Sequence, residues 1–115
     1  MTSLEVMLNM FGKSADPNSG GRQMPMHWGY KKLGIISMGS SIGTTLPRAP
    51  GVALASKLQG QNAVTMVYFG EGAASEGDFH EGLAFAGVHR LPVVFLCNNH
   101  GWALSLIPIS DPTRL

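Results

Sequence analysis

Charged residues are scarce in this chain: Asp, Glu, Lys and Arg make up 13% of its 115 residues, whereas 44% are hydrophobic. A chain so poor in charge and so rich in apolar side chains is expected to fold around a packed core, which argues against disorder. The low charge also indicates that part of the surface meets other protein rather than water. Because the net charge is only +1 and the basic residues are scattered, a nucleic-acid partner is not expected.

Cysteine occurs only once, and long hydrophobic runs are missing. The single Cys97 excludes an internal disulfide, and its place in an apolar run predicts a reduced, buried thiol. No apolar run reaches the length of a membrane span, so no membrane partner is expected. Residues 1–8 lack the basic start and the cleavage pattern of a signal peptide, and a cytoplasmic location in a bacterium is expected.

One stretch of the chain does carry a distinctive pattern. An apolar run at residues 64–69 ends in Gly70-Glu71-Gly72, and a helix start follows. Such a turn brings backbone amides and one carboxylate to the carboxyl end of a strand, where open α/β sheets bind ligands. Free N–H groups at a helix start suit phosphate, while a carboxylate suits a hard cation such as Mg²⁺. The residues therefore predict a site for a metal ion and a diphosphate.

Hydrophobic periodicity places this motif in an alternating series of strands and helices. The strand from Val64 to Phe69 is apolar throughout, which predicts burial on both faces. An alternating order implies parallel pairing and right-handed crossovers, so the fold class is α/β, as part of a doubly wound parallel sheet. The expected elements are a helix capped by Ser3 and ended by Gly12, strands at 35–38, 64–69 and 91–97, a helix opened by Pro47 that runs to 58, and a helix at 78–88.

Three longer segments of the chain resemble one enzyme family. They are Gly-Arg-Gln-Met-Pro-Met-His-Trp-Gly at 21–29, Gly-Glu-Gly-Ala-Ala-Ser-Glu-Gly-Asp at 70–78, and Asn-Asn-His-Gly-Trp-Ala at 98–103. They resemble the alpha subunit of the decarboxylating component of 2-oxoacid dehydrogenase complexes, most closely its branched-chain type. The second and third segments are similar to the thiamine diphosphate motif, Gly-Asp-Gly followed at a distance by Asn. Residues 1–103 are accordingly expected to be a fragment of the thiamine-diphosphate-binding domain of such a subunit.

The resemblance implies a metal site built by two turns. Glu71 would bind Mg²⁺ through its carboxylate, and Trp102 would bind it through its backbone carbonyl. The register set by Gly101 and Trp102 puts His100 where the family carries a metal-binding Asn. Because imidazole nitrogen favours softer metals, His100 is expected to weaken the Mg²⁺ site unless Asn99 moves in to replace it.

The resemblance also implies how the organic part of the cofactor is held. The amides at Gly72 and Ala73 would face the diphosphate, with Asn98 nearby. Ser40 would contact the aminopyrimidine, and Ile42 would support the bent cofactor so that its amino group lies near the reactive carbon. The implied cofactor-binding residues are Ser40, Ile42, Gly70, Glu71, Gly72, Ala73, Asn98, His100 and Trp102.

A potassium ion is a further possible cofactor by resemblance. Branched-chain relatives hold K⁺ around the loop that here spans residues 39–45. Ser41, Thr44 and Thr45 stand at the matching positions but differ from the residues common in the family, so K⁺ is not firmly expected.

The implied activity is thiamine-diphosphate-dependent oxidative decarboxylation of branched-chain 2-oxoacids. The acyl group would pass to a lipoyl group on the acyltransferase core of the complex. In the family, the glutamate that activates the pyrimidine belongs to the beta subunit, so no catalytic residue is expected in this fragment. An alpha2-beta2 heterotetramer is therefore the implied working form, and the fragment alone is expected to be inactive.

Other functions remain open at this point. A pyruvate or acetoin dehydrogenase alpha subunit would carry the same cofactor motif, because substrate-pocket residues lie mostly outside these segments. A truncated assembly partner that pairs with a beta subunit but cannot hold Mg²⁺ would explain His100. A generic nucleotide-binding domain is the weakest alternative, since the chain has neither a P-loop lysine nor the three-glycine dinucleotide fingerprint.

The last twelve residues, 104–115, fit neither the family nor the strand–helix pattern. They resemble translated sequencing-adapter sequence, so a non-native tail is expected, with a diverged loop as the alternative. If the tail is not native, His100 close to that junction would itself be a sequencing error for Asn.

Overall fold

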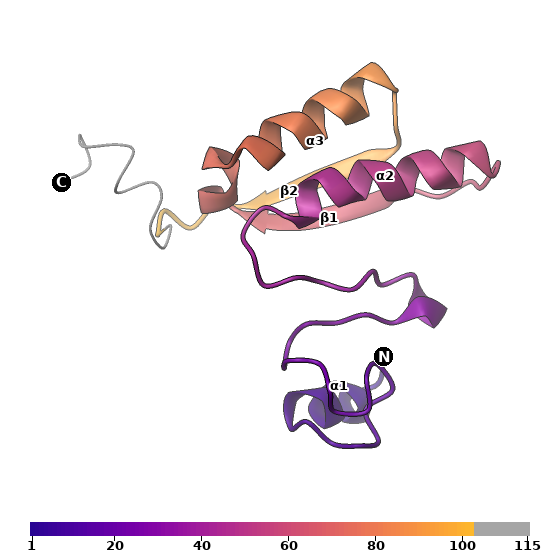
Figure 1. The fold of residues 1–115 in the computed structure, drawn as a ribbon, viewed down its shortest axis with the longest axis vertical. Helices are drawn as coiled ribbons and strands as arrows, with labels where there is room; N and C mark the ends of the chain where they lie inside the picture. Colours follow the sequence, from indigo (N-terminus) through magenta and orange to yellow (C-terminus); the bar gives the residue numbers. More distant parts are fainter. Residues whose placement is uncertain (103–115) are drawn as a thin grey trace. The chain divides into compact units, whose positions relative to one another are not determined.

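The computed structural model describes residues 1–102, and the compact parts of the chain divide after Ser40 into an N-terminal and a C-terminal unit. Both are drawn in Figure 1, and each is described by itself. The N-terminal unit contains α1 (Ser3–Met10) and a 3₁₀ turn, η1 (Lys31–Leu33). The C-terminal unit contains α2 (Thr45–Leu58), β1 (Thr65–Gly70), the 3₁₀ helix η2 (Glu71–Ser75), α3 (Gly77–Val88) and β2 (Val93–Asn98). Among the described residues, no helix has the length and apolar character needed to cross a membrane.

Helix α1 begins with a capping box one residue earlier than expected. Thr2, rather than Ser3, is the cap: its Oγ1 accepts the N–H of Glu5, and the Glu5 carboxylate accepts the N–H of Thr2. The apolar side of the helix stays open within the described chain, with Leu4 69% exposed. The buried residue of α1 is the polar Asn9, so a polar network orders this unit.

The strand expected at residues 35–38 does not form. Tyr30 and Ile35 make one isolated antiparallel bridge, exchanging N–H and C=O groups around the 3₁₀ turn. Gly34 closes this turn in the left-handed region, at φ +68°, so the two sides separate after a single pair. Met38 instead donates its N–H to the carbonyl of Trp28, which leaves the segment as an extended loop.

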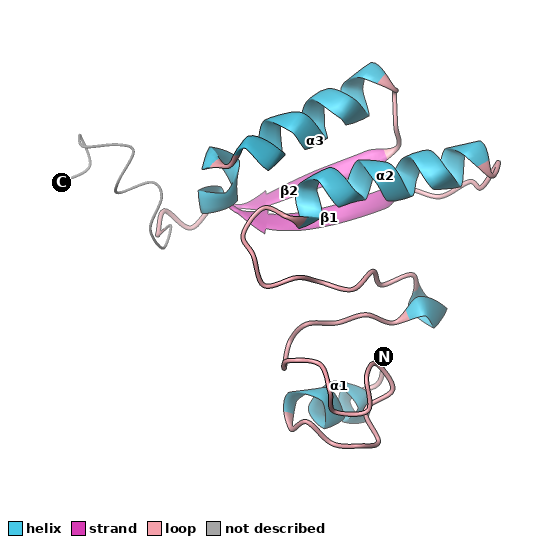
Figure 2. Ribbon diagram, in the orientation of Figure 1, coloured by secondary structure: helices cyan, strands magenta, loops and turns pink. Residues whose placement is uncertain are grey.

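The C-terminal unit confirms the α/β class. Its two strands pair in parallel, with residue 65 opposite 93 and Gly70 opposite Asn98, and α3 connects them. Figure 2 shows α2 and α3 running beside each other along the strands. The parallel register makes both strands end at the same edge, so the turns that follow them meet there.

Only one face of the sheet is covered by described residues. Alternate strand residues such as Val67 and Phe69 pack toward the two helices, while Tyr68, between them, is 65% exposed. Burial on both faces was therefore a wrong prediction for this part of the chain, because α2 and α3 pack on the same side. Cys97 is likewise exposed rather than buried. The core consists of Leu46, Ala49, Val67 and Ala73, with Phe69, Phe79, Val93 and Phe95 packed against it.

Helices α2 and α3 touch closely at Gly82. A Cβ on Gly82 would lie 2.7 Å from the carbonyl oxygen of Leu46. That carbonyl lacks its usual helical donor because the residue four positions later is Pro50, which has no N–H and is fully buried. Gly82 and Pro50 thus act on the same group: Pro50 leaves the Leu46 carbonyl without a helical donor, and Gly82 leaves space beside that carbonyl. The helix starts at Thr45, so Pro47 is its third residue rather than its first.

Candidate functional site

The two turns predicted to build a metal site do meet at the carboxyl ends of β1 and β2. Glu71 follows β1 directly, and the segment 99–102 follows β2. The backbone N–H of Trp102 donates to Oε1 of Glu71 at 2.8 Å, across a separation of 31 residues. Nδ1 of His100 lies 3.4 Å from the same oxygen. Parallel pairing therefore brings Glu71, His100 and Trp102 together.

Glu71 presents a buried negative charge to this edge. The residue is 8% exposed. Its own backbone N–H lowers the pKa of the carboxyl group, and burial raises it. The Trp102 N–H lowers the pKa further, as does the positive charge that His100 carries when its ring is protonated, so the net shift is downward. The carboxyl group is therefore ionised at neutral pH, which is the form that can bind a cation.

His100 is the residue that faces this carboxylate, and Asn99 is not. The side-chain oxygen of Asn99 accepts the N–H of Gly101 at 3.1 Å, in a local turn closed by Gly101 at φ +73°. Nδ1 of His100 also lies 3.1 Å from the Trp102 nitrogen, so one N–H is shared between the carboxylate and the imidazole. The alternative in which Asn99 takes the place of His100 is therefore not the arrangement of this turn.

Trp102 meets the carboxylate through its N–H, whereas the sequence predicted that its carbonyl would bind the metal. Asn98, the last residue of β2, is exposed and lies opposite Gly70. Roles for the Trp102 carbonyl and for Asn98 in cofactor binding stay predictions.

The predicted diphosphate-binding amides lie at the start of η2. Bonds of a 3₁₀ helix close over three residues, so the N–H of Gly72 has no acceptor within the helix, whereas the N–H of Ala73 stands where the carbonyl of the cap residue Gly70 can accept it. Diphosphate binding by these two amides stays a prediction. Ala73 is buried in the core, which fixes this turn against β1. Gly70, just before the turn, is extended, and a Cβ there would meet nothing within 4 Å. The amide of Gly72 and the carboxylate of Glu71 are thereby held on one short, anchored turn.

The loop that leads into α2 packs against the segment after η2. Gly43 has φ +83°, and a Cβ on it would lie 3.3 Å from the Glu76 side chain, so both conformation and space favour glycine. Ile42 beside it is exposed. The hydroxyl of Thr44 donates to the carbonyl of Ser41 at 3.0 Å. Two oxygen atoms are thus close together in this loop, and K⁺ binding there stays a prediction.

Ser40 lies in the N-terminal unit, where it is paired with a histidine that the sequence gave no role. Its Oγ is 2.8 Å from Nε2 of His27, and Nδ1 of His27 is 2.9 Å from the carbonyl of Pro25. Because a carbonyl can only accept, Nδ1 carries a hydrogen, and in the neutral ring Nε2 is then the acceptor for the Ser40 hydroxyl. Met26 before it has φ +66°, rare for this residue type, and its N–H bonds to Asn9. The only sequence signal for His27 was its place in the 21–29 segment.

A second buried carboxylate, Asp16, organises the loop that precedes this pair. It is 4% exposed. Burial raises the pKa of Asp16, but hydrogen bonds from Asn18, Ser19 and Asn9 outweigh it and hold the pKa well below the usual range. Its donors are the side chain of Asn9, the backbone and side chain of Asn18, the backbone and hydroxyl of Ser19, and the backbone of Gly21.

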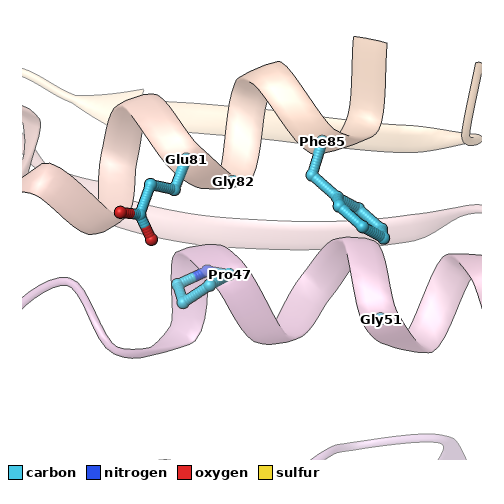
Figure 3. Close-up of a pocket in the computed structure, with 5 residues that line it drawn as sticks. All are labelled: Pro47, Gly51, Glu81, Gly82 and Phe85. Atoms are coloured by element: carbon cyan, nitrogen blue, oxygen red, sulfur yellow. The ribbon is translucent and has the colours of Figure 1, made fainter. Parts of the chain in front are cut away.

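No group of three or more His, Cys, Asp or Glu side chains that could hold a metal occurs within residues 1–102. Glu71 and His100 form a pair, so any metal there needs further ligands. A groove between α2 and α3 lies elsewhere, and none of the predicted site residues lines it. Figure 3 shows Phe85 and Glu81 of α3 beside Pro47 and Gly51 of α2 in this groove.

The chain is similar in sequence to a family of known proteins over most of its length. The sequence profile described as "Dehydrogenase E1 component" matches residues 1–111. The chain is 49% identical over 106 residues to 2-oxoisovalerate dehydrogenase subunit alpha of Bacillus subtilis, covering 92% of this chain and 32% of that protein. It is 48% identical over 104 residues to subunit alpha 1 of Arabidopsis thaliana, covering 90% and 22%. The human subunit alpha is 43% identical over 108 residues, covering 94% and 24%. The chain thus spans a third or less of the length of these relatives.

Proposed function

We propose that this chain, which belongs to the dehydrogenase E1 component family, forms the metal- and diphosphate-binding part of a branched-chain 2-oxoacid dehydrogenase alpha subunit. The proposed reaction is thiamine-diphosphate-dependent oxidative decarboxylation, with transfer of the acyl group to a lipoyl group. Support for the branched-chain substrate comes from the relatives, which are named 2-oxoisovalerate dehydrogenase alpha subunits.

The observation that carries the proposal is the buried, ionised carboxylate of Glu71 at the carboxyl end of β1, held against the turn at 100–102. The donor chemistry there fits a metal diphosphate. A carboxylate attracts a cation, while the N–H groups of Gly72 and Ala73 at the start of η2 suit phosphate oxygens. A cation and an anion would therefore be bound side by side on one turn.

Within this proposal, the residues of the chain bind and orient. Glu71 would hold the metal ion, which neutralises the charge of the diphosphate, together with His100 or the Trp102 carbonyl. Ser40 would orient the aminopyrimidine through its hydroxyl, which is 2.8 Å from Nε2 of His27. Ile42 would support the bent form of the cofactor. When bound, thiamine diphosphate supplies the electron sink for the carbanion that forms as CO₂ leaves.

The proposal includes partners, because the relatives are named as alpha subunits of a dehydrogenase. A beta subunit would supply the pyrimidine-activating glutamate in an alpha2-beta2 assembly, and a lipoyl-bearing acyltransferase core would receive the acyl group. Exposed apolar side chains on the open sheet face, such as Met66, Tyr68 and Leu96, are consistent with burial by further protein.

One observation favours a second candidate, an assembly partner without activity. His100 stands beside Glu71 in a site that would otherwise be made of oxygen ligands, and imidazole is a poor ligand for Mg²⁺. Such a chain would pair with a beta subunit yet bind the cofactor weakly. A pyruvate or acetoin dehydrogenase alpha subunit differs only in substrate.

The test uses the intact alpha subunit that contains this segment, assembled with its beta subunit. Calorimetry with thiamine diphosphate and MgCl₂ or MnCl₂ is expected to show binding. Glu71→Gln should weaken it by at least about 100-fold, since even outer-shell metal partners contribute about 10- to 100-fold. Glu81→Gln, an exposed carboxylate on α3, is the matched control and should leave binding unchanged.

Equal binding by Glu71→Gln and the parent protein would contradict the proposed site. Absence of binding by a correctly assembled parent protein would favour the inactive assembly partner. Turnover of 2-oxoisovalerate, pyruvate and acetoin by the reconstituted complex then separates the substrate classes.

A further inference from the structure

We propose that Glu71 and His100 form a mixed oxygen and nitrogen metal site, which selects a first-row transition ion such as Mn²⁺ over Mg²⁺. This inference rests on the proposed function, because the diphosphate of the cofactor would supply the remaining anionic ligands. It goes further by naming the class of ion that this chain takes.

The spacing of the two side chains suits a shared ion. Nδ1 of His100 lies 3.4 Å from Oε1 of Glu71. Two donors about 2.1 Å from one ion, at right angles to each other, are about 3 Å apart. A shift of a few tenths of an ångström would thus let both atoms bind the same ion. The His100 ring has room for this shift, because 56% of its side chain is exposed.

The N–H of Trp102 already marks the position between these two acceptors. Its nitrogen is 2.8 Å from the carboxylate oxygen and 3.1 Å from the imidazole nitrogen. An N–H carries partial positive charge, so both acceptors direct lone pairs to one point. A cation would take the place of this hydrogen as the Trp102 peptide turns, and Gly101 in the left-handed region stands at the position where that turn would occur.

The neutral form of the His100 ring has the arrangement that a metal needs. In neutral His100, Nδ1 accepts the Trp102 N–H, so the hydrogen of the ring is on Nε2 and the Nδ1 lone pair faces Glu71. Asn99 does not compete for the position, because its side-chain oxygen bonds the N–H of Gly101. The nitrogen, rather than an amide oxygen, is therefore the second protein donor.

Ligand type then decides the ion. Mg²⁺ prefers oxygen ligands and loses its water reluctantly, whereas imidazole suits first-row transition ions. The carboxylate and the phosphate oxygens keep the site acceptable to Mn²⁺, which tolerates both oxygen and nitrogen. Replacing one oxygen donor by the His100 nitrogen therefore moves the preference away from Mg²⁺.

The experiment compares the intact, assembled protein with His100→Asn, in the presence of thiamine diphosphate. Titrations with MnCl₂ followed by electron paramagnetic resonance, and with MgCl₂ by calorimetry, give the ratio of the two dissociation constants. His100→Asn should reduce the preference for Mn²⁺ by about tenfold or more. Pulsed resonance spectra of bound Mn²⁺ should show coupling to a ring nitrogen, which His100→Asn removes. His80→Gln, on the exposed side of α3, should change neither readout.

Equal selectivity in both proteins, or a Mn²⁺ spectrum without nitrogen coupling, would overturn this inference. If the protein still binds thiamine diphosphate in that case, the proposed function stands. An intact gene that encodes Asn at position 100 would overturn it as well. Failure to bind thiamine diphosphate with either ion would reject the proposed function, and the inference with it.

Discussion

The N-terminal and C-terminal units of this chain are ordered by different forces. Both units leave many large apolar side chains exposed, but the buried part of residues 1–40 is a hydrogen-bonded network around Asp16 and Asn9. Residues 41–102 instead pack two helices on a parallel strand pair, with Leu46 and Val67 in a shared core. Polar contacts are thus central in one unit and peripheral in the other, so a lost hydrogen bond should matter most in the first.

The same contrast distinguishes the two buried carboxylates. Asp16 accepts six hydrogen bonds, all from residues within its own unit, which saturates its oxygen atoms. Glu71 accepts the N–H of Trp102 on Oε1, and the same oxygen lies 3.4 Å from Nδ1 of His100. Burial is therefore a poor guide to function here, and the number of local donors is a better one. A saturated carboxylate orders a loop, while a less saturated one remains able to bind a cation.

The largest structural effect is expected from Asp16→Asn. The amide would place hydrogen atoms against donors such as the Ser19 hydroxyl, so the loop at 16–21 should lose order. Hydrogen exchange of the intact subunit should show lost protection at the backbone N–H groups of Asn18, Ser19 and Gly21, with β1 and β2 unchanged. Glu81→Gln is the control. Unchanged protection would show that Asp16 does not organise this loop.

Acidification provides a second readout of the same group. Because the folded-state pKa of Asp16 is lowered, its contribution to stability is fully present above its ordinary value of 3.8 and is lost as the pH falls below that value, through the lowered pKa. Protection of the 16–21 loop should therefore persist at pH 5 and decline below about pH 4. Loss of protection already at pH 5 would contradict the assignment.

Packing in the C-terminal unit can be tested at two glycines of the same helix. Gly82→Ala would bring a Cβ to 2.7 Å from the Leu46 carbonyl and force α2 and α3 apart, at a cost of about 1–3 kcal/mol. Gly87→Ala meets nothing within 4 Å and should stabilise α3 by up to about 1 kcal/mol through helix propensity. Denaturation of the intact subunit measures both. A stabilising Gly82→Ala would show that the helices can separate without loss.

The smallest effect is expected from Lys57→Met. The Lys57 ammonium donates to the carbonyls of His89 and Arg90, beyond the carboxyl end of α3, where a cation is favoured. Its loss should cost about 0.5–1 kcal/mol, since the contact is exposed. Lys13→Met, in the N-terminal unit, is the control in the same denaturation assay. If Lys57→Met lowered stability much more than Gly82→Ala, polar contacts would matter more than packing in the C-terminal unit, contrary to the comparison above.

Much of the C-terminal unit was predictable from local pattern. The apolar run before Gly70 predicted β1, the helical spacing from Asp78 predicted α3, and their order predicted parallel pairing. The strand at 35–38 failed because Gly34 turns the chain tightly and no neighbouring strand continues the ladder. Burial of β1 on both faces failed because periodicity indicates which residues are apolar, and it does not indicate how much protein is present to cover them.

The sequence by itself determined the identity and order of the groups at the site: a carboxylate after one strand, amides behind it, and an Asn-Asn-His-Gly turn after the next strand. Only the tertiary structure decided which of these groups face one another. Register places Glu71 against the second turn. The N–H of Gly101 donates to the side-chain oxygen of Asn99, so His100 and not Asn99 faces the carboxylate. The physical reason is that side-chain direction in a turn depends on its own backbone hydrogen bonds and on the strand pairing that holds it, neither of which spacing along the chain specifies.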